Sequence, residues 1–176
     1  MRKLTLLIAI LFFGSNINAQ IAYQQGDNQL NFGFNVGQGP GIYGSYEVGI
    51  TDNISIGGEA ALGFRAGVGN FIYSSYNYFQ ANIRFSGFAN YHFAQLVGLP
   101  DEWDLYGGAD IGYSIWTKSS NAPDIAYDVY NWNQSSFMIG AHGGGRWFWN
   151  EKWGVNAEVG GGLGYFIIKG GLTMKL

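Results

Sequence analysis

The chain has 176 residues, a formal net charge of −3 and no cysteine. Charged residues make up 12% of it, below the ~25% of ordinary globular domains, and aromatic residues make up 18%. The length fits a single domain. The lack of cysteine excludes disulfides and thiol chemistry, the acidic balance argues against nucleic-acid binding, and so few charges are unfavourable for a soluble monomer.

Residues 1–19 are typical of a secretory signal peptide. A basic start is followed by an apolar core over 4–13 and by a small, polar exit. We expect cleavage after Ala19, which leaves residues 20–176 as one mature barrel domain. The apolar run is shorter than the ~20 residues of a membrane-spanning helix, which favours a cleaved signal over a retained anchor.

The mature chain alternates apolar and polar residues and shows no helical period. No stretch of it is long and apolar enough for a membrane helix, so lipid contact would need strands, in which only alternate residues must be apolar. The alternation predicts strands at about 30–37, 42–50, 54–65, 78–93, 103–116 and 135–148, and a terminal hairpin over 154–176. Longer connections are expected at 66–77, 94–102 and 117–134, and short turns elsewhere.

The terminal hairpin ends the chain on an apolar residue. Val155, Ala157 and Val159 alternate with polar or small residues, and the pattern continues to Leu172 and Leu176. Such a last strand fits an outer-membrane barrel, in which it pairs with the first strand and removes the unpaired edges. We therefore predict an all-β fold, an eight-stranded antiparallel up-and-down transmembrane β-barrel.

The scarcity of charged residues also predicts whether the apolar face of the barrel wall points outward or into the lumen. A soluble lipocalin-like barrel would need many Lys and Glu residues outside, but the polar face here is mostly Gly, Ser and Asn. The apolar face should therefore contact lipid, and the polar face should line the lumen. An eight-stranded barrel is filled by its own side chains, so we expect its charges to pair as a polar plug. The predicted lumen residues are Glu47, Glu59, Arg65, Arg84, Asp110, His142, Arg146, Glu158, Lys169 and Lys175.

Two further features belong to this prediction. Phe88 interrupts the alternation, and an aromatic ring inside a barrel can fill a gap left by glycines. All six tryptophans lie near predicted strand ends, as expected for aromatic girdles at two lipid–water interfaces. One girdle would contain Trp103, Trp147, Trp149 and Trp153, and the other Trp116 and Trp132.

The leader, the eight alternating strands, the aromatic strand ends and the C-terminal segment 171–176 together resemble the small OmpA/OmpX-type outer-membrane barrels. Leu176 departs from the terminal Phe that is usual in that family, and only the membrane half of the OmpA pattern is present. The resemblance implies a monomer in the outer membrane of a Gram-negative-type bacterium, after signal removal and insertion by the barrel assembly machinery.

The sequence contains no motif for a metal, nucleotide or other cofactor. Spacing places no His–Ser–acid arrangement among His92, His142, Ser114 and Ser136, so we predict no enzymatic activity. The predicted function is structural, or a surface interaction through extracellular loops. The loop 118–134 combines aromatic residues with Asn and Asp, which suits a glycan or protein partner. Two alternatives stay open, a small pore with a charged lumen and a soluble lipocalin-like binding barrel.

Overall fold

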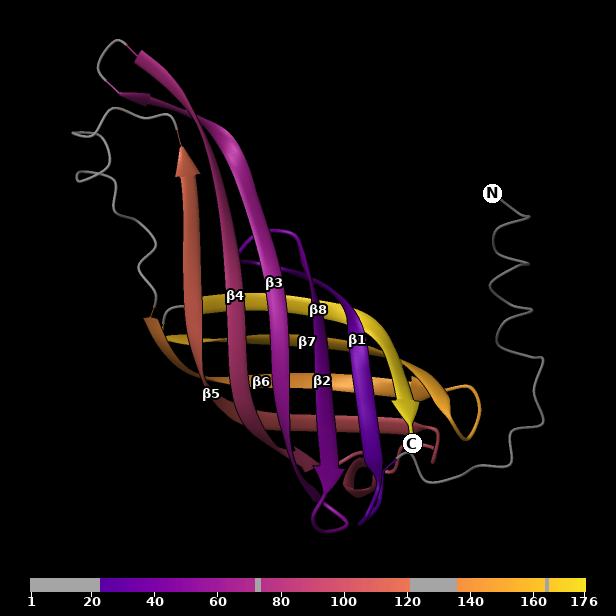
Figure 1. Ribbon diagram of the computed structural model, residues 1–176. Coiled ribbons are helices and arrows are strands. Elements are labelled where there is room, and N and C mark those ends of the chain that lie inside the picture. The colour runs from indigo at the N-terminus through magenta and orange to yellow at the C-terminus, as the bar shows by residue number, and fades with distance from the viewer. Residues whose placement is uncertain (1–22, 72–73, 121–135, 164) are drawn as a thin grey trace, which may run out of the picture.

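The computed structural model describes residues 23–71, 74–120, 136–163 and 165–176. These residues form a closed barrel of eight strands in chain order (Figure 1). Every strand pairs antiparallel with its neighbours, and β1 closes on β8 from Gln29↔Lys175 to Val36↔Ile168. The predicted all-β, up-and-down barrel is confirmed. The strands are β1 (Asn28–Val36), β2 (Gly41–Gly49), β3 (Ile54–Phe71), β4 (Ser74–His92), β5 (Trp103–Ser120), β6 (Ser136–Phe148), β7 (Trp153–Leu163) and β8 (Tyr165–Lys175).

Strands β3, β4 and β5 are longer than the sequence predicted. The loop expected over 66–77 is wrong, because β3 continues to Phe71 and β4 begins at Ser74 in a paired hairpin. Strand β5 likewise continues to Ser120, into the predicted loop 117–134. Its remaining residues, 121–134, lie outside the described part of the chain. The apolar–polar alternation fades over these residues, so the sequence pattern gave no sign that the strands continue.

The barrel has two rims. We call the end that holds Leu176 and the connections 50–53, 93–102 and 149–152 the C-terminal rim, and the end with the β3–β4 hairpin the hairpin rim (Figure 1). The connection 93–102 contains a short 3₁₀ turn, η1 (Gln95–Val97), where the sequence predicted no helix. Within the described ranges, no helix is long and apolar enough to cross a membrane.

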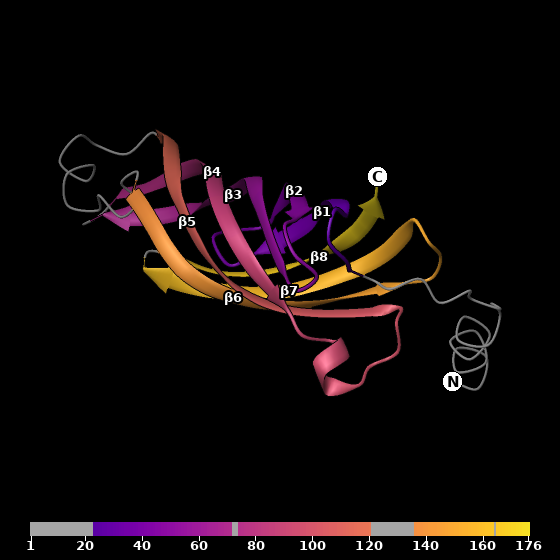
Figure 2. The same cartoon turned by 90° about the horizontal axis from the view of Figure 1, so that it is seen from below.

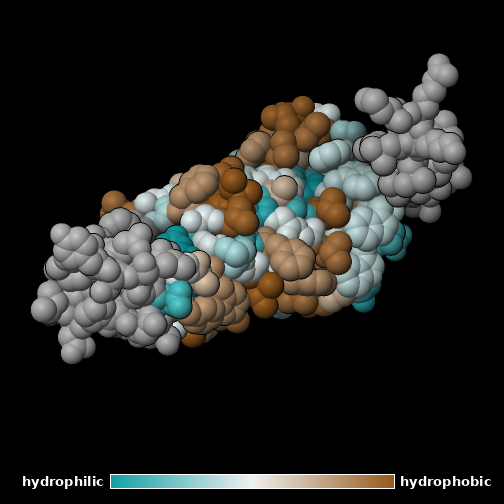
Figure 3. All heavy atoms as spheres, turned by 90° about the horizontal axis from the view of Figure 1, so that it is seen from above, coloured by the Kyte–Doolittle hydropathy of each residue, from teal (hydrophilic) through white to brown (hydrophobic). Residues whose placement is uncertain are grey.

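The two faces of the wall have opposite polarity. Outward side chains are apolar, and the exposed fraction reaches 75% at Phe34 and 60% at Phe137. Hydrophobic side chains, in brown, cover much of the face seen in Figure 3. Inward positions bury polar groups such as Gln29, Glu47 and Arg146. This polarity confirms that the apolar face points outward, because a soluble barrel would show the reverse.

Phe88 fills the space above an inward-facing glycine, as predicted. A Cβ added at Gly57 would lie 2.4 Å from Phe88 Cζ, far inside van der Waals contact, so the ring occupies the volume that a side chain would take. Gly58, the next residue, faces outward, and its added Cβ would have the Ser86 carbonyl oxygen as nearest atom, at 3.8 Å.

Gly57→Ala is therefore expected to lower the free energy of unfolding by about 1–3 kcal/mol, because the added methyl group overlaps both the Phe88 ring and the Tyr46 carbonyl oxygen, at 2.4 Å from each. Gly58→Ala is the matched control and should stay within about 0.5 kcal/mol of the parent. Urea titration of the folded protein in detergent, followed by tryptophan fluorescence, measures both. Adding Phe88→Leu to Gly57→Ala should recover part of the loss. Equal midpoints for the two alanine variants would contradict this packing.

Candidate functional site in the barrel lumen

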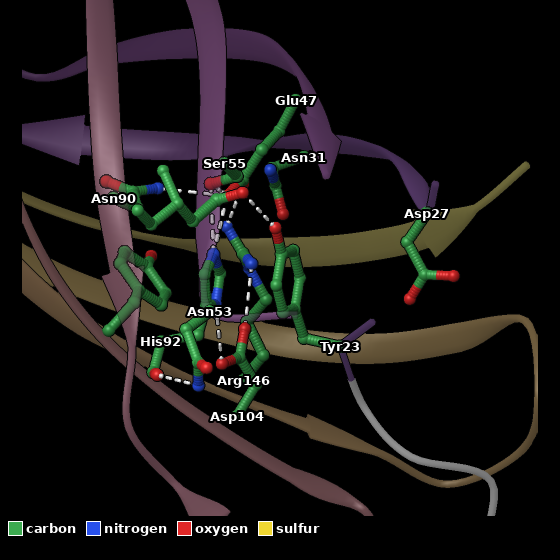
Figure 4. Close-up of polar contacts among 12 residues, drawn as sticks. Tyr23, Asp27, Asn31, Glu47, Asn53, Ser55, Asn90, His92, Asp104 and Arg146 are labelled. Carbon is green, nitrogen blue, oxygen red and sulfur yellow. Dashed lines mark hydrogen bonds and ion pairs between the residues drawn. The ribbon is translucent and has the colours of Figure 1, made fainter. Parts of the chain in front are cut away.

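The C-terminal half of the lumen is organised around Arg146. Its Nη1 lies 2.8 Å from Asp104 Oδ2, its Nη2 pairs with Glu47, and its guanidinium lies over the Tyr106 ring, 4.3 Å from the centroid (Figure 4). Glu47 comes from β2 and Arg146 from β6, so this one side chain joins strands that are not neighbours in the wall. All three ionic partners are buried. We call these residues, with Ser55 and His92, the Arg146 cluster.

His92 completes the cluster with both ring nitrogens. Its Nδ1 lies 2.8 Å from Asp104 Oδ1, and its Nε2 lies 2.9 Å from Ser55 Oγ and 3.2 Å from Glu47 Oε1. The imidazole ring therefore bridges the two buried acids, one at each nitrogen.

Tyr23 covers this cluster from the segment before β1. Its ring stacks on His92 with the centroids 3.5 Å apart and an interplanar angle of 4°. The hydroxyl donates to the carbonyl oxygens of Ile54, at 2.6 Å, and Thr51, at 3.1 Å. Burial raises the pKa of Tyr23 well above its usual value, so the hydroxyl stays a neutral donor. Figure 4 shows the tyrosine beside the histidine at the mouth of the barrel.

Ser55, His92 and Asp104 have the order of a serine–histidine–acid triad, which sequence spacing did not indicate. A nucleophilic serine must pass its proton to the histidine, but Ser55 Oγ donates to Glu47 and is fully buried. The cavity beside His92 and Asp104 measures about 20 Å³ and is not lined by Ser55. The arrangement therefore fixes the imidazole ring and has no room for a substrate.

A second set of ion pairs, the Lys169 cluster, contains Glu59, Arg84, Glu158 and Lys169. Lys169 Nζ lies 2.5 Å from both Glu59 Oε2 and Glu158 Oε1, and Arg84 Nη2 lies 2.7 Å from Glu59 Oε1. The Tyr106 hydroxyl donates to Glu158 at 3.0 Å and so links this cluster to Arg146.

Further hydrogen-bonded side chains complete the filling of this part of the lumen. The Tyr165 hydroxyl donates to Asp110 at 2.5 Å, and His142 lies between Asp110, at 3.2 Å, and Asn90 Oδ1, at 2.7 Å. Near the β1–β8 seam, a hydrogen-bonded chain runs through Ser45, Asn31, Thr173, Asn156 and Tyr43. The cavity left among these groups measures about 30 Å³, room for about two water molecules. Among the residues that the structure describes, no cluster of His, Asp and Glu is suited to hold a metal ion.

Two of the predicted lumen cations lie apart from these clusters. Lys175 pairs with Asp27 at 3.0 Å near the C-terminal rim. Arg65 lies at the hairpin rim, where its Nη2 is 3.4 Å from the Gly37 carbonyl oxygen. The others meet in the lumen network: Glu47, Glu59, Arg84, Asp110, His142, Arg146, Glu158 and Lys169.

Sequence reasoning left several network residues out. The predicted lumen set omitted His92 and Asp104, although both lie within the predicted strands and on the polar side of the alternation. The alternation also placed Tyr43 and Tyr106 on that side, but the set was restricted to charged residues and His142. Tyr165 was missed because it lies in the reversal of the predicted terminal hairpin.

Four tryptophans gather at the C-terminal rim. The Trp147 ring centroid lies 6.4 Å from that of Trp103 and 6.5 Å from that of Trp149, and Trp153 packs edge-on against Phe32 at 6.4 Å. Trp103, Trp147 and Trp153 occupy outward positions of their strands. They are placed to meet lipid at one interface.

The tryptophan at the hairpin rim has a different environment. Trp116 has the same parity in β5 as the buried Ser114, and Arg65 lies over its ring, 5.2 Å from the centroid. Its position is therefore on the lumen side of the wall, whereas the girdle prediction placed it toward lipid. The prediction used only the nearness of the tryptophan to a strand end. It did not use the alternation along the strand, which decides the side of the wall on which a residue lies. Trp132 lies outside the described residues.

Comparison with known proteins supports the fold. OprG from Pseudomonas aeruginosa is 12% identical with a TM-score of 0.66, covering 88% of this chain and 98% of that one. The N-terminal β-barrel domain of Pseudomonas aeruginosa OprF is 16% identical with a TM-score of 0.54, covering 86% and 98%. Ail from Yersinia pestis, in complex with the heparin analogue sucrose octasulfate, is 11% identical with a TM-score of 0.55, covering 87% and 100%. No family model and no curated protein matches the chain. The chain thus has the fold of the small OmpA/OmpX-type outer-membrane barrels.

Proposed function

We propose that this chain is a non-enzymatic barrel of a Gram-negative-type outer membrane, and that it acts through the surface it presents at the hairpin rim. The observation that supports this most is the filling of the lumen among the described residues, where the cavity between the paired charges measures about 30 Å³. A barrel closed in this way can neither admit a substrate nor pass a solute without breaking buried ion pairs, each of which is costly to separate.

The unequal strands support the second half of the proposal. The pairing of β2 with β3 ends at Gly41↔Gly63, but β3 and β4 stay paired to Phe71↔Ser74, and β4 and β5 to Tyr78↔Ser120. A three-stranded sheet therefore continues past the shorter wall at the hairpin rim (Figure 1). Long connections face the cell exterior in such barrels and short turns face the periplasm. We take the hairpin rim as extracellular.

The partner that we propose is a surface glycan or protein, contacted by the projecting sheet and by the connection 118–134. Most of that connection lies outside the described residues. Outer-membrane lipid is the second partner, through the apolar outer wall. Removal of the signal peptide, insertion by the barrel assembly machinery and a monomeric state belong to the same proposal.

The two alternatives fit the structure less well. A lipocalin-like barrel binds apolar ligands in an apolar interior, whereas this interior is polar and occupied. A small pore would need a continuous water path, and the Arg146 and Lys169 clusters cross the lumen from several strands.

The purified protein is expected to give no steady conductance in a planar bilayer at neutral pH, because the paired lumen side chains leave no path for ions. Insertion is checked separately, since a folded barrel runs differently on a gel before and after boiling. Reproducible channels of defined size would overturn this expectation. The lumen charges would then be selectivity residues.

Deleting residues 119–133 should abolish binding to cells, glycans or a protein partner while the barrel stays folded. Among the described residues, the pairing of β5 with β6 runs from Trp103↔Trp147 to Ser114↔Ser136 and ends before residue 119, so the deletion should leave it intact. Binding of labelled protein to cells, with the parent chain as control, is the measurement. Undiminished binding by the folded deletion variant would move the interaction away from this connection.

A further inference from the structure

The connection between β4 and β5 leaves two neighbouring aliphatic side chains uncovered. The exposed fraction is 67% at Leu96 and 59% at Val97. The other described turns at the same rim, 50–53 and 149–152, are shorter and have polar residues at their tips. Nothing in the closure of the barrel requires this longer connection, since four residues suffice at the other two places.

The backbone of this connection is closed on itself. The amides of Leu96, Gly98 and Leu99 donate to the carbonyl oxygens of Phe93, Gln95 and Ala94, each at 3.1 Å. Gly98 ends the turn in the left-handed region, at φ 72°. Ala94 is buried, so one side of the turn is packed on the barrel while Leu96 and Val97 are held away from it. The exposed pair is therefore built into a formed turn and is directed outward.

The turn adjoins the tryptophan group of the C-terminal rim. The Phe93 amide donates to the Leu105 carbonyl oxygen, and the Trp103 amide donates to the Pro100 carbonyl oxygen. Both hydrogen bonds lie next to the start of β5. Trp103 itself is 40% exposed on the outer wall. Figure 2 shows the short helical turn standing out sideways from the wall beside the start of β5, not continuing along the strands. The apolar surface of the wall thus extends onto the turn.

We propose that the connection 93–102 is an interfacial anchor that inserts Leu96 and Val97 into the lipid leaflet at the C-terminal rim. Aliphatic side chains gain by leaving water, and tryptophans mark the depth at which lipid meets water. Asp101, exposed on the same connection, stays on the headgroup side. The anchor fixes how deeply the barrel sits in the membrane at the start of β5. Strands β4 and β5, which the anchor joins, belong to the sheet that projects at the hairpin rim.

The absence of cysteine makes this placement directly measurable. Leu96→Cys, labelled with an environment-sensitive fluorophore, is compared with Asn150→Cys, an exposed residue of the β6–β7 turn at the same rim. Both are placed in phosphatidylcholine nanodiscs, which leave both rims open to solvent. Compared with the label at 150, we expect the label at 96 to emit at shorter wavelength and to be quenched less by acrylamide. Lipids with a nitroxide on the acyl chain should quench it more. The label at 150 should show the reverse.

Val97→Cys is the second reporter, should Leu96→Cys fail to give the folded gel mobility. Acrylamide quenching at 96 and 97 equal to that at 150, in folded protein, would overturn the anchor. The exposed pair would then face water and offer a surface to a soluble protein. This outcome would leave the proposed role of the hairpin rim unchanged, because that role is read from binding and conductance.

Discussion

Arg146→Met lowers the free energy of unfolding by about 3–5 kcal/mol, the expected result of removing one partner from a buried ion pair. Methionine keeps the length of the side chain but leaves Glu47 and Asp104 buried without the guanidinium that lies between them. The Tyr106 ring also loses the charge that lies over its face. Urea unfolding in detergent, followed by tryptophan fluorescence, measures the change.

Lys152→Met is the matched control for Arg146→Met. Lys152 is an exposed cation in the β6–β7 turn, so its removal should change the free energy of unfolding by no more than about 0.5 kcal/mol. Similar urea midpoints for the two variants would show that the Arg146 cluster does not hold the barrel together. The gel mobility of unboiled samples tells a destabilised barrel from one that never closed.

Glu59→Gln is expected to have the second largest effect, again about 3–5 kcal/mol. Glu59 is the acid between Arg84 and Lys169. When Glu59 is neutralised, Lys169 keeps Glu158, whereas Arg84 loses the carboxylate with which it pairs among the described residues. The same urea titration applies, with the exposed Glu151→Gln as control.

A double substitution separates the ion pair from general damage at this site. Glu59→Gln combined with Arg84→Met removes both charges of the pair, so its loss of stability should be smaller than the sum of the two single losses. Strict additivity of the three measurements would contradict an ion pair between Glu59 and Arg84. A midpoint for Glu59→Gln that matches Glu151→Gln would contradict the Lys169 cluster as a whole.

The number of strands, the closure and the polarity of the wall followed from the sequence because lipid on one side and a narrow lumen on the other force a strict period of two. Phe88 is an example, since its break in the pattern predicted the glycine that it covers. The same period assigned Glu47 and Arg146 to one interior. It could not pair them, because the stagger between strands decides which inward residues meet across the lumen.

The remaining errors arise where that period no longer applies. The paired strand ends 66–71 and 74–77 lack a clear apolar–polar alternation, so they were predicted as a loop. Tyr23 lies outside every strand, and its place on His92 depends on a segment that folds back into the barrel mouth. Trp116 shows that nearness to a strand end gives the height of a side chain but not its direction.

The Arg146 and Lys169 clusters also determine when the barrel can finish folding. Glu47 and Arg146 are 99 residues apart in the chain, and Glu59 and Lys169 are 110 apart. Contacts at such separations form late, because the intervening chain must first be ordered. The charges can lose their water only as the β1–β8 seam closes, and reopening the seam must hydrate all of them together. We therefore expect a high barrier to opening to set the lifetime of the closed barrel, so that its persistence in the membrane depends on rate more than on equilibrium.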